Sequence, residues 1–217
     1  TAVIGAATAW SAHRAAIEAF AHETGARADA AHDMAHLSRV VSMAGRLAAD
    51  ECAAIDIVLP AAWLHDCVHV PVTSPDRPRA SVMAADVAVR LLVHIGYPAA
   101  LHDGIHHAIA AHSFSARIAP HTVEARVVQD ADRLDALGAI GIARCLMLGG
   151  QLGHVLYDVA DPFAEQRPPD DRVASLDHFH TKLLTLAGTM QTDAGRREGA
   201  RRTEYMRGYL TQLRGEI

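Results

Sequence analysis

The adjacent side chains of His65 and Asp66 have the types that bind a divalent metal ion. They come at the end of a strongly apolar segment, residues 54–67. Burying an imidazole next to a carboxylate there costs free energy unless both groups find partners. A metal ion satisfies both groups at once. For an isolated His-Asp dipeptide the ordinary alternative is a helix end that contacts solvent.

Two further groups of residues argue against that alternative. His32 and His36 are four residues apart in an earlier segment with helical periodicity, so they share one helix face. In addition, three acidic residues interrupt a later apolar helical pattern. Packing explains acids in such a pattern poorly. One metal ligand, one partner that orients a ligand and one helix cap explain them better. Residues two apart on a helix differ by about 200°, so the first two of these acids are rivals for one ligand position. The three acids are Asp130, Asp132 and Asp135.

Apolar residues recur with helical periodicity along most of the chain, and no strand-like alternation is convincing. Abundant alanine and only 5% aromatic residues also favour helix over sheet, so we predict an all-α fold. Thr8 is a suitable N-cap, and Pro60 is expected early in its helix or at its true start. Gly149 and Gly150 are expected to end theirs. The predicted helices span residues 8–23, 33–50, 54–67, 80–95, 99–112, 121–135, 138–148, 174–190 and 195–214.

Two segments lack this periodicity and are predicted loops. Residues 68–79 are rich in proline, and residues 151–173 combine proline, aspartate and glycine. We nevertheless expect one domain over 1–217, because two closing helices alone do not bury a core. Its core spans about 15–150, and a C-terminal helical extension of about 174–214 packs on it.

Composition narrows the functional classes. The formal net charge of −5 gives no reason to expect nucleic acid or an anionic membrane as partner. No apolar run is long enough to span a bilayer, and no secretory signal is visible. Three widely spaced cysteines argue against a disulfide framework and favour a reducing cytoplasm.

Several motifs together resemble the HD-domain superfamily of metal-dependent phosphohydrolases, and in particular its small bacterial YedJ/YpgQ-type branch. The resemblance covers roughly residues 15–214 and implies a compact helical bundle. Its most specific part is the run that contains the three acids. The matching segments are His32–Val40, Leu64–Val68, Ala111–Ser115, Gln129–Gly141 and His178–Leu184.

The resemblance implies that His36, His65, Asp66 and Asp132 hold one divalent metal ion. Asp132 is preferred over Asp130 because it matches the family acid in the Ala-Asp-Arg-Leu run. The ion would be Mn²⁺, Mg²⁺, Fe²⁺, Co²⁺ or Ni²⁺. Mixed nitrogen and oxygen ligands favour Mn²⁺ or Fe²⁺.

Three histidines are further candidates for the site. HD-type sites often recruit histidines that contact phosphate or bind a second metal, which here are His112 and His107. His69, about one helical turn after Asp66, is a candidate general base or phosphate ligand because imidazoles titrate near neutral pH. The branch usually carries a different polar residue there, and an exposed loop histidine is the alternative.

Four cationic or imidazole side chains are candidates for phosphate binding. Lys182 is the only lysine beside nineteen arginines, which suggests a need for a compact ammonium group, and His178 lies four residues before it. A guanidinium fork suits phosphate oxygens, so Arg77 and Arg133 are included. An ordinary surface charge is the alternative for Arg77, and an ion pair with Asp135 or a neighbouring acid is the alternative for Arg133.

The predicted activity is hydrolysis of a phosphate ester or anhydride, with the metal activating water and Asp66, His69, His112 and Lys182 as catalytic residues. The resemblance points to a small nucleotide substrate and to either pyrophosphohydrolase or 5′-phosphatase chemistry. One alternative is an HD-type di-iron oxygenase, which needs His107 and His112 to bind a second metal about 3.5–4 Å from the first. Another is a nucleotide-binding regulator with a vestigial site. The sequence predicts no oligomeric state.

Overall fold

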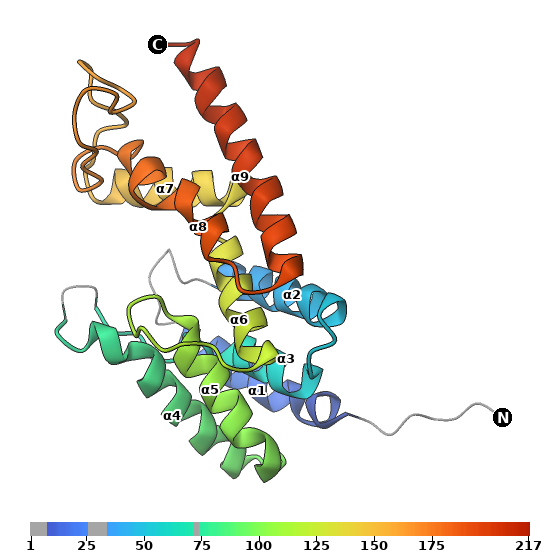
Figure 1. Cartoon of the computed structure of the whole chain (residues 1–217). Coiled ribbons are helices and arrows are strands. Elements are labelled where there is room, and N and C mark those ends of the chain that lie inside the picture. The colour runs from blue at the N-terminus through green and yellow to red at the C-terminus, as the bar shows by residue number, and fades with distance from the viewer. Residues whose placement is uncertain (1–7, 26–33, 72–73) are drawn as a thin grey trace. The chain divides into compact units, whose positions relative to one another are not determined.

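The structure is a computed structural model that describes residues 8–25, 34–71 and 74–217. These residues form nine α-helices with short 3₁₀ and π-helical turns and contain no strand, which confirms the all-α prediction (Figure 1). Their only β-type pairing is a single bridge between Val155 and Ala174. By its internal contacts the chain divides into two compact units, Thr1–Ala131 and Asp132–Ile217.

The first unit is built around α3, which packs against α1, α2 and α5. Helices α4 and α5 lie side by side along their length (Figure 1). No helix among the described residues is both long and apolar enough to cross a membrane. The helices of this unit are α1 (Ala9–Gly25), α2 (Met34–Asp50), α3 (Ile55–Leu64), α4 (Ala80–His94), α5 (His102–His112) and most of α6 (Val123–Leu134).

The start of α1 and the middle of α3 show how local chemistry sets these elements. Thr8 caps α1 as predicted, because its Oγ1 accepts the Ser11 N–H at 3.1 Å. Pro60 is the sixth of ten residues in α3, so the prediction that it lies early or marks the start is wrong. Proline has no N–H and leaves the Asp56 carbonyl without its helix partner. The Tyr97 hydroxyl donates to that carbonyl at 2.6 Å and replaces the missing bond.

The predicted helix boundaries hold with small differences. Helix α3 ends at Leu64 rather than at residue 67, so His65 is its C-cap and Asp66 lies in the following turn. His32, and Asp33 at the start of the predicted helix 33–50, lie outside the described residues. Residues 99–112 divide into a short 3₁₀ turn, Ala99–Leu101, and α5.

The second unit contains the end of α6 and three further helices, of which α7 and α9 pack against each other. Helix α7 continues through Gly149 and Gly150, so the prediction that they end it is wrong. A Cβ atom on Gly149 would lie 2.0 Å from the Ser175 Oγ, so glycine there permits a close approach between two segments. The three helices are α7 (Gly138–Gln151), α8 (Leu184–Leu186) and α9 (Asp193–Arg214).

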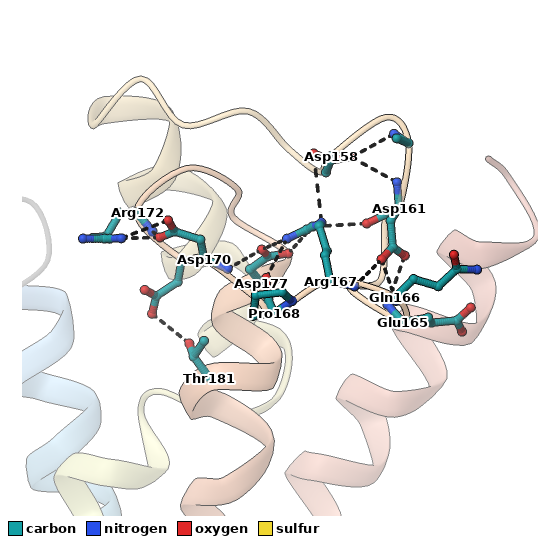
Figure 2. Close-up of polar contacts among 12 residues, drawn as sticks. Asp158, Asp161, Glu165, Gln166, Arg167, Pro168, Asp170, Arg172, Asp177 and Thr181 are labelled. Carbon is teal, nitrogen blue, oxygen red and sulfur yellow. Dashed lines mark hydrogen bonds and ion pairs between the residues drawn. The ribbon is translucent and has the colours of Figure 1, made fainter.

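The long predicted loop is organised around Arg167 (Figure 2). Its guanidinium donates to both carboxylate oxygens of Asp177, at 2.5 and 2.9 Å, and to the Asp161 carbonyl at 3.1 Å. The predicted helix 174–190 is broken into short pieces: turns up to Leu176, a π-helical turn from Phe179 to Leu183, α8, and a 3₁₀ turn. The Arg167–Asp177 pair therefore anchors the start of the π-helical turn.

Candidate metal centre

Three predicted ligands of the first unit converge. Their ligand atoms, one each from His36, His65 and Asp66, all lie within 4.8 Å of one another. The His65 Nε2 is 3.3 Å and the His36 Nε2 is 3.9 Å from the Asp66 Oδ2. With metal–ligand bonds of about 2.0–2.2 Å, opposite ligands lie up to about 4.4 Å apart. The three donors therefore fit one first-row divalent ion with little adjustment.

Two helices that pack against each other place these donors. His36 lies on the first turn of α2, and its side chain is buried next to Leu37 and Val40. His65 caps the apolar helix α3 and is completely buried. The Asp66 side chain is one-third exposed, so the group reaches solvent on one side. Of the three side chains, the Asp66 carboxylate is therefore the one that solvent reaches most.

Backbone contacts fix the protonation of two of the rings. The His65 Nδ1 is 2.8 Å from the Ala62 carbonyl, and the His112 Nδ1 is 2.7 Å from the Ile109 carbonyl. A carbonyl only accepts, so each Nδ1 carries a proton, and each ring, when it is neutral, presents its Nε2 lone pair. Lone pairs that face a carboxylate repel it unless a cation lies between them. Metal-ligating histidines show this same arrangement.

His112 lies beside the three converging residues, and its role in a pocket stays a prediction. Its Nε2 lies 3.6 Å from the Asp66 Oδ1, and its ring meets that of His65 edge to face at 4.9 Å between centroids. Only 7% of His112 is exposed. Of the two histidines of α5 that the sequence named as candidates, His112 is the one that lies beside Asp66, whereas His107 contacts His121.

The charge of Asp66 suits a ligand. Burial by itself raises the pKa of this carboxyl. When no metal ion is bound, the charge of a protonated His65 and hydrogen bonds from His112 and His65 outweigh burial and hold the pKa of Asp66 well below its ordinary value. The side chain is therefore a carboxylate at neutral pH, ready to bind a cation.

The acids of α6 fall on either side of the division between the two units. Asp130 belongs to the first unit and is completely buried. Asp132 is the first residue of the second unit and is half-buried. Its role as fourth ligand, in preference to Asp130, stays a prediction. Asp135 accepts a hydrogen bond from Arg144 at 2.6 Å.

The other candidates of the first unit have contacts away from the three ligands. The His107 Nε2 accepts the His121 N–H at 3.0 Å, and the two rings stack. Burial, and then the neighbouring histidines, lower the pKa of His107, which keeps it a neutral acceptor. Arg77 donates from one Nη to the Val70 carbonyl at 2.8 Å, and His69 is exposed.

The candidates of the second unit lie on or near the π-helical turn. Lys182 is on this turn and is exposed. The His178 Nδ1 contacts the Asp171 carboxylate at 2.8 Å, a partner that the sequence did not reveal. Arg133 donates to the Thr189 carbonyl at 2.8 Å. Isolated π-helical turns are frequent at functional sites, which adds an independent reason to consider Lys182.

Comparison with known proteins places this geometry in a family. The HD-domain family model matches residues 34–137. The Bacillus subtilis protein YpgQ is 36% identical over 190 residues, which cover 86% of this chain and 84% of YpgQ. The chain belongs to the HD-domain family. The segment that matches the HD model contains the whole His36, His65 and Asp66 cluster as well as Asp132.

Solved structures of HD-domain proteins share the whole fold. The crystal structure of Bacillus subtilis YpgQ in complex with ADP has a TM-score of 0.76 at 34% identity and covers 97% of both chains. An HD-superfamily hydrolase from Bacillus thuringiensis has a TM-score of 0.75 at 30% identity, covering 96% of this chain and 98% of its own. The family, the fold and the cluster of ligand atoms together support a metal-dependent hydrolase.

Proposed function

We propose that this HD-domain protein is a metal-dependent phosphohydrolase that acts on nucleotides. The observation that carries the proposal is the convergence of His36, His65 and Asp66 within 4.8 Å of one another, in a fold shared with an HD-superfamily hydrolase. Asp132 completes the ligand set in this proposal.

Four residues of the first unit have separate tasks in the proposed reaction. His36 and His65 hold the ion through Nε2, and Asp66 holds it as an ionised carboxylate. A bound divalent ion lowers the pKa of its water and polarises a phosphate oxygen. His112, whose Nδ1–H is held by the Ile109 carbonyl, keeps its Nε2 on the side of Asp66. There it accepts a proton from water or, once protonated, donates to a phosphate oxygen.

The choice of a nucleotide has two supports. The YpgQ structure that matches 97% of this chain is a complex with ADP. In addition, Lys182 is exposed, and Arg77 uses one N–H for the Val70 carbonyl and keeps other N–H donors for phosphate oxygens. His69, His107, Arg133 and His178 are retained as candidate contacts with water or phosphate. The product distinguishes the two reactions: pyrophosphate indicates pyrophosphohydrolysis, and inorganic phosphate indicates a 5′-phosphatase.

The test is a release assay for phosphate and pyrophosphate over nucleoside mono-, di- and triphosphates, with Mn²⁺, Mg²⁺, Co²⁺ and Ni²⁺ supplied separately. We expect activity to require metal and to fall more than about a hundredfold in His65→Ala and Asp66→Ala, since even indirect partners of metals contribute 10–100-fold. His106→Ala is the matched control, because His106 pairs with Asp86 on the surface. Full activity in His65→Ala would contradict the proposal.

A further inference from the structure

The C-terminal end of α5 is closed by side chains. The last four carbonyls of a helix have no partner within it. In α5 the first of them, at Ile109, accepts from the Nδ1 of His112, the last residue of the same helix. His112 is therefore held by its own helix end, and its position depends on how firmly that end is fixed.

Two buried residues from other helices fix it. Ser81, on α4, donates its hydroxyl to the Ala110 carbonyl at 2.9 Å. Gln129, on α6, donates its amide to the Ala111 carbonyl at 2.7 Å. Ser81 and Gln129 are each only 3% exposed. If either donor is lost, water does not readily replace it as a hydrogen-bond donor to the carbonyl. Three consecutive carbonyls at this end thus have side-chain partners.

We propose that Ser81 and Gln129 are positioning residues for His112. They hold the last turn of α5 so that the His112 Nε2 stays 3.6 Å from the Asp66 carboxylate. Without them the turn frays, as helix ends do, and the His112 Nδ1–H exchanges its carbonyl partner for water. The consequence for catalysis rests on the proposed function, whereas the effect on the His112 ring does not.

The first measurement reads the ring directly. Long-range ¹H–¹⁵N spectra of histidine-labelled protein in Mg²⁺ buffer report which ring nitrogen carries the proton, and His112→Gln identifies the signal. We compare Ser81→Thr with Ser81→Val. Threonine and valine have side chains of the same shape, and only threonine keeps the hydroxyl. We expect the Nδ1–H form in the wild type and in Ser81→Thr. In Ser81→Val and in Gln129→Met we expect a mixture of tautomers.

A control separates positioning from stability. Ile105→Val removes one buried methylene from α5, away from its C-terminal end, and it lowers stability without changing the cap. We expect its His112 signal to match that of the wild type. An unchanged His112 signal in both Ser81→Val and Gln129→Met, in folded protein, overturns the proposal. If Ser81→Thr does not fold, Gln129→Met alone decides.

The second measurement uses whichever nucleotide the release assay identifies. We expect kcat of the Ser81→Val, Gln129→Met double variant to fall at least about tenfold with little change in KM, because small misplacements of an active-site group have effects of this size. Ile105→Val should keep both constants. If the wild type hydrolyses nothing, the proposed function fails, and the tautomer measurement still decides the positioning role.

Discussion

Glu198 on α9 holds two arginines at once. Its carboxylate accepts from Arg201 at 2.8 Å and from the Arg202 Nε at 2.7 Å. The Arg201 bonds, with help from Arg202, outweigh burial and lower the pKa of Glu198 to about 2. An unfolded glutamate has a pKa of about 4.3. The lowered pKa stabilises the fold above about pH 4.3, and this contribution disappears as the pH falls towards 2.

We expect Glu198→Gln to lower the free energy of unfolding at pH 7 by about 1–2 kcal/mol, less than the pKa shift alone implies because Arg201 is exposed and screened. The difference from wild type should shrink steadily between pH 4 and pH 2, as urea denaturation at several pH values will show. Glu204→Gln, whose exposed partner Arg207 is 3.7 Å away, is the matched control. A difference that stays constant with pH contradicts the assignment.

The sequence predicted which residues of the first unit converge better than it predicted the surroundings of single histidines. His36, His65 and Asp66 converge because packed helices bring their ends together. His107 and His112 were both pocket candidates, but five residues on a helix correspond to a rotation of about 140°. They therefore point in different directions, and only His112 contacts Asp66. Which one faces the metal ligands depends on the packing of α5, which the sequence does not display.

Helix α7 illustrates a feature that local sequence rules miss. Glycine pairs commonly follow helix ends, so Gly149 and Gly150 were expected to stop this helix. The helix instead runs to Gln151, and Ser175 packs directly against Gly149, a tertiary contact between residues far apart in the sequence. The π-helical turn from Phe179 to Leu183 was also not predicted. Most other helices were predicted within a few residues, because their apolar periodicity is strong.

The two glycines of α7 should respond in opposite directions to alanine. In Gly149→Ala the new Cβ lies 2.0 Å from the Ser175 Oγ, and we expect a loss of about 1–3 kcal/mol from overpacking. In Gly150→Ala the Cβ meets nothing within 4 Å, and we expect a gain of up to about 1 kcal/mol from helix propensity. Thermal or urea denaturation of both variants measures the difference. Equal effects at the two positions would show that Ser175 does not pack closely on α7.

We expect the local stability of the loop before the π-helical turn to depend on Arg167 (Figure 2). The Asp177 side chain is only 1% exposed, and its hydrogen bonds with Arg167 outweigh burial and keep the pKa of this carboxyl low. In Arg167→Leu the buried carboxylate loses its cation, which is strongly unfavourable. We expect hydrogen exchange at the amides of Glu165–Arg167 and Asp170 to accelerate at least tenfold or so, as the loop opens locally.

The matched control for this prediction is Arg172→Leu. Arg172 is 86% exposed and pairs only with Asp170, so its loss should leave exchange in the loop nearly unchanged. Equal exchange in the two variants would mean that Arg167 does not hold the loop. The same comparison reports on the π-helical turn, because Asp177 lies two residues before its first residue.

Helix α6 contains both the boundary between the two units and the predicted ligand Asp132. The division falls between Ala131 and Asp132, inside one continuous helix. The most specific motif of the sequence, Gln129–Gly141, spans the same point. Gln129 supports His112 in the first unit, and the predicted ligand Asp132 begins the second. We expect this residue of α6 to be one of the metal ligands.

This expectation gives a test on the intact protein. A ligand that binds only the folded state adds about 2.7 kcal/mol at a hundredfold excess over Kd. In a chain of this length that corresponds to a rise in Tm of about 5–10 °C. We expect Mn²⁺ to raise Tm by this amount in a single transition, and we expect His65→Ala to abolish the shift. Asp132→Ala should abolish it as well, whereas a lost shift in Asp130→Ala with a retained shift in Asp132→Ala would assign the fourth ligand to Asp130.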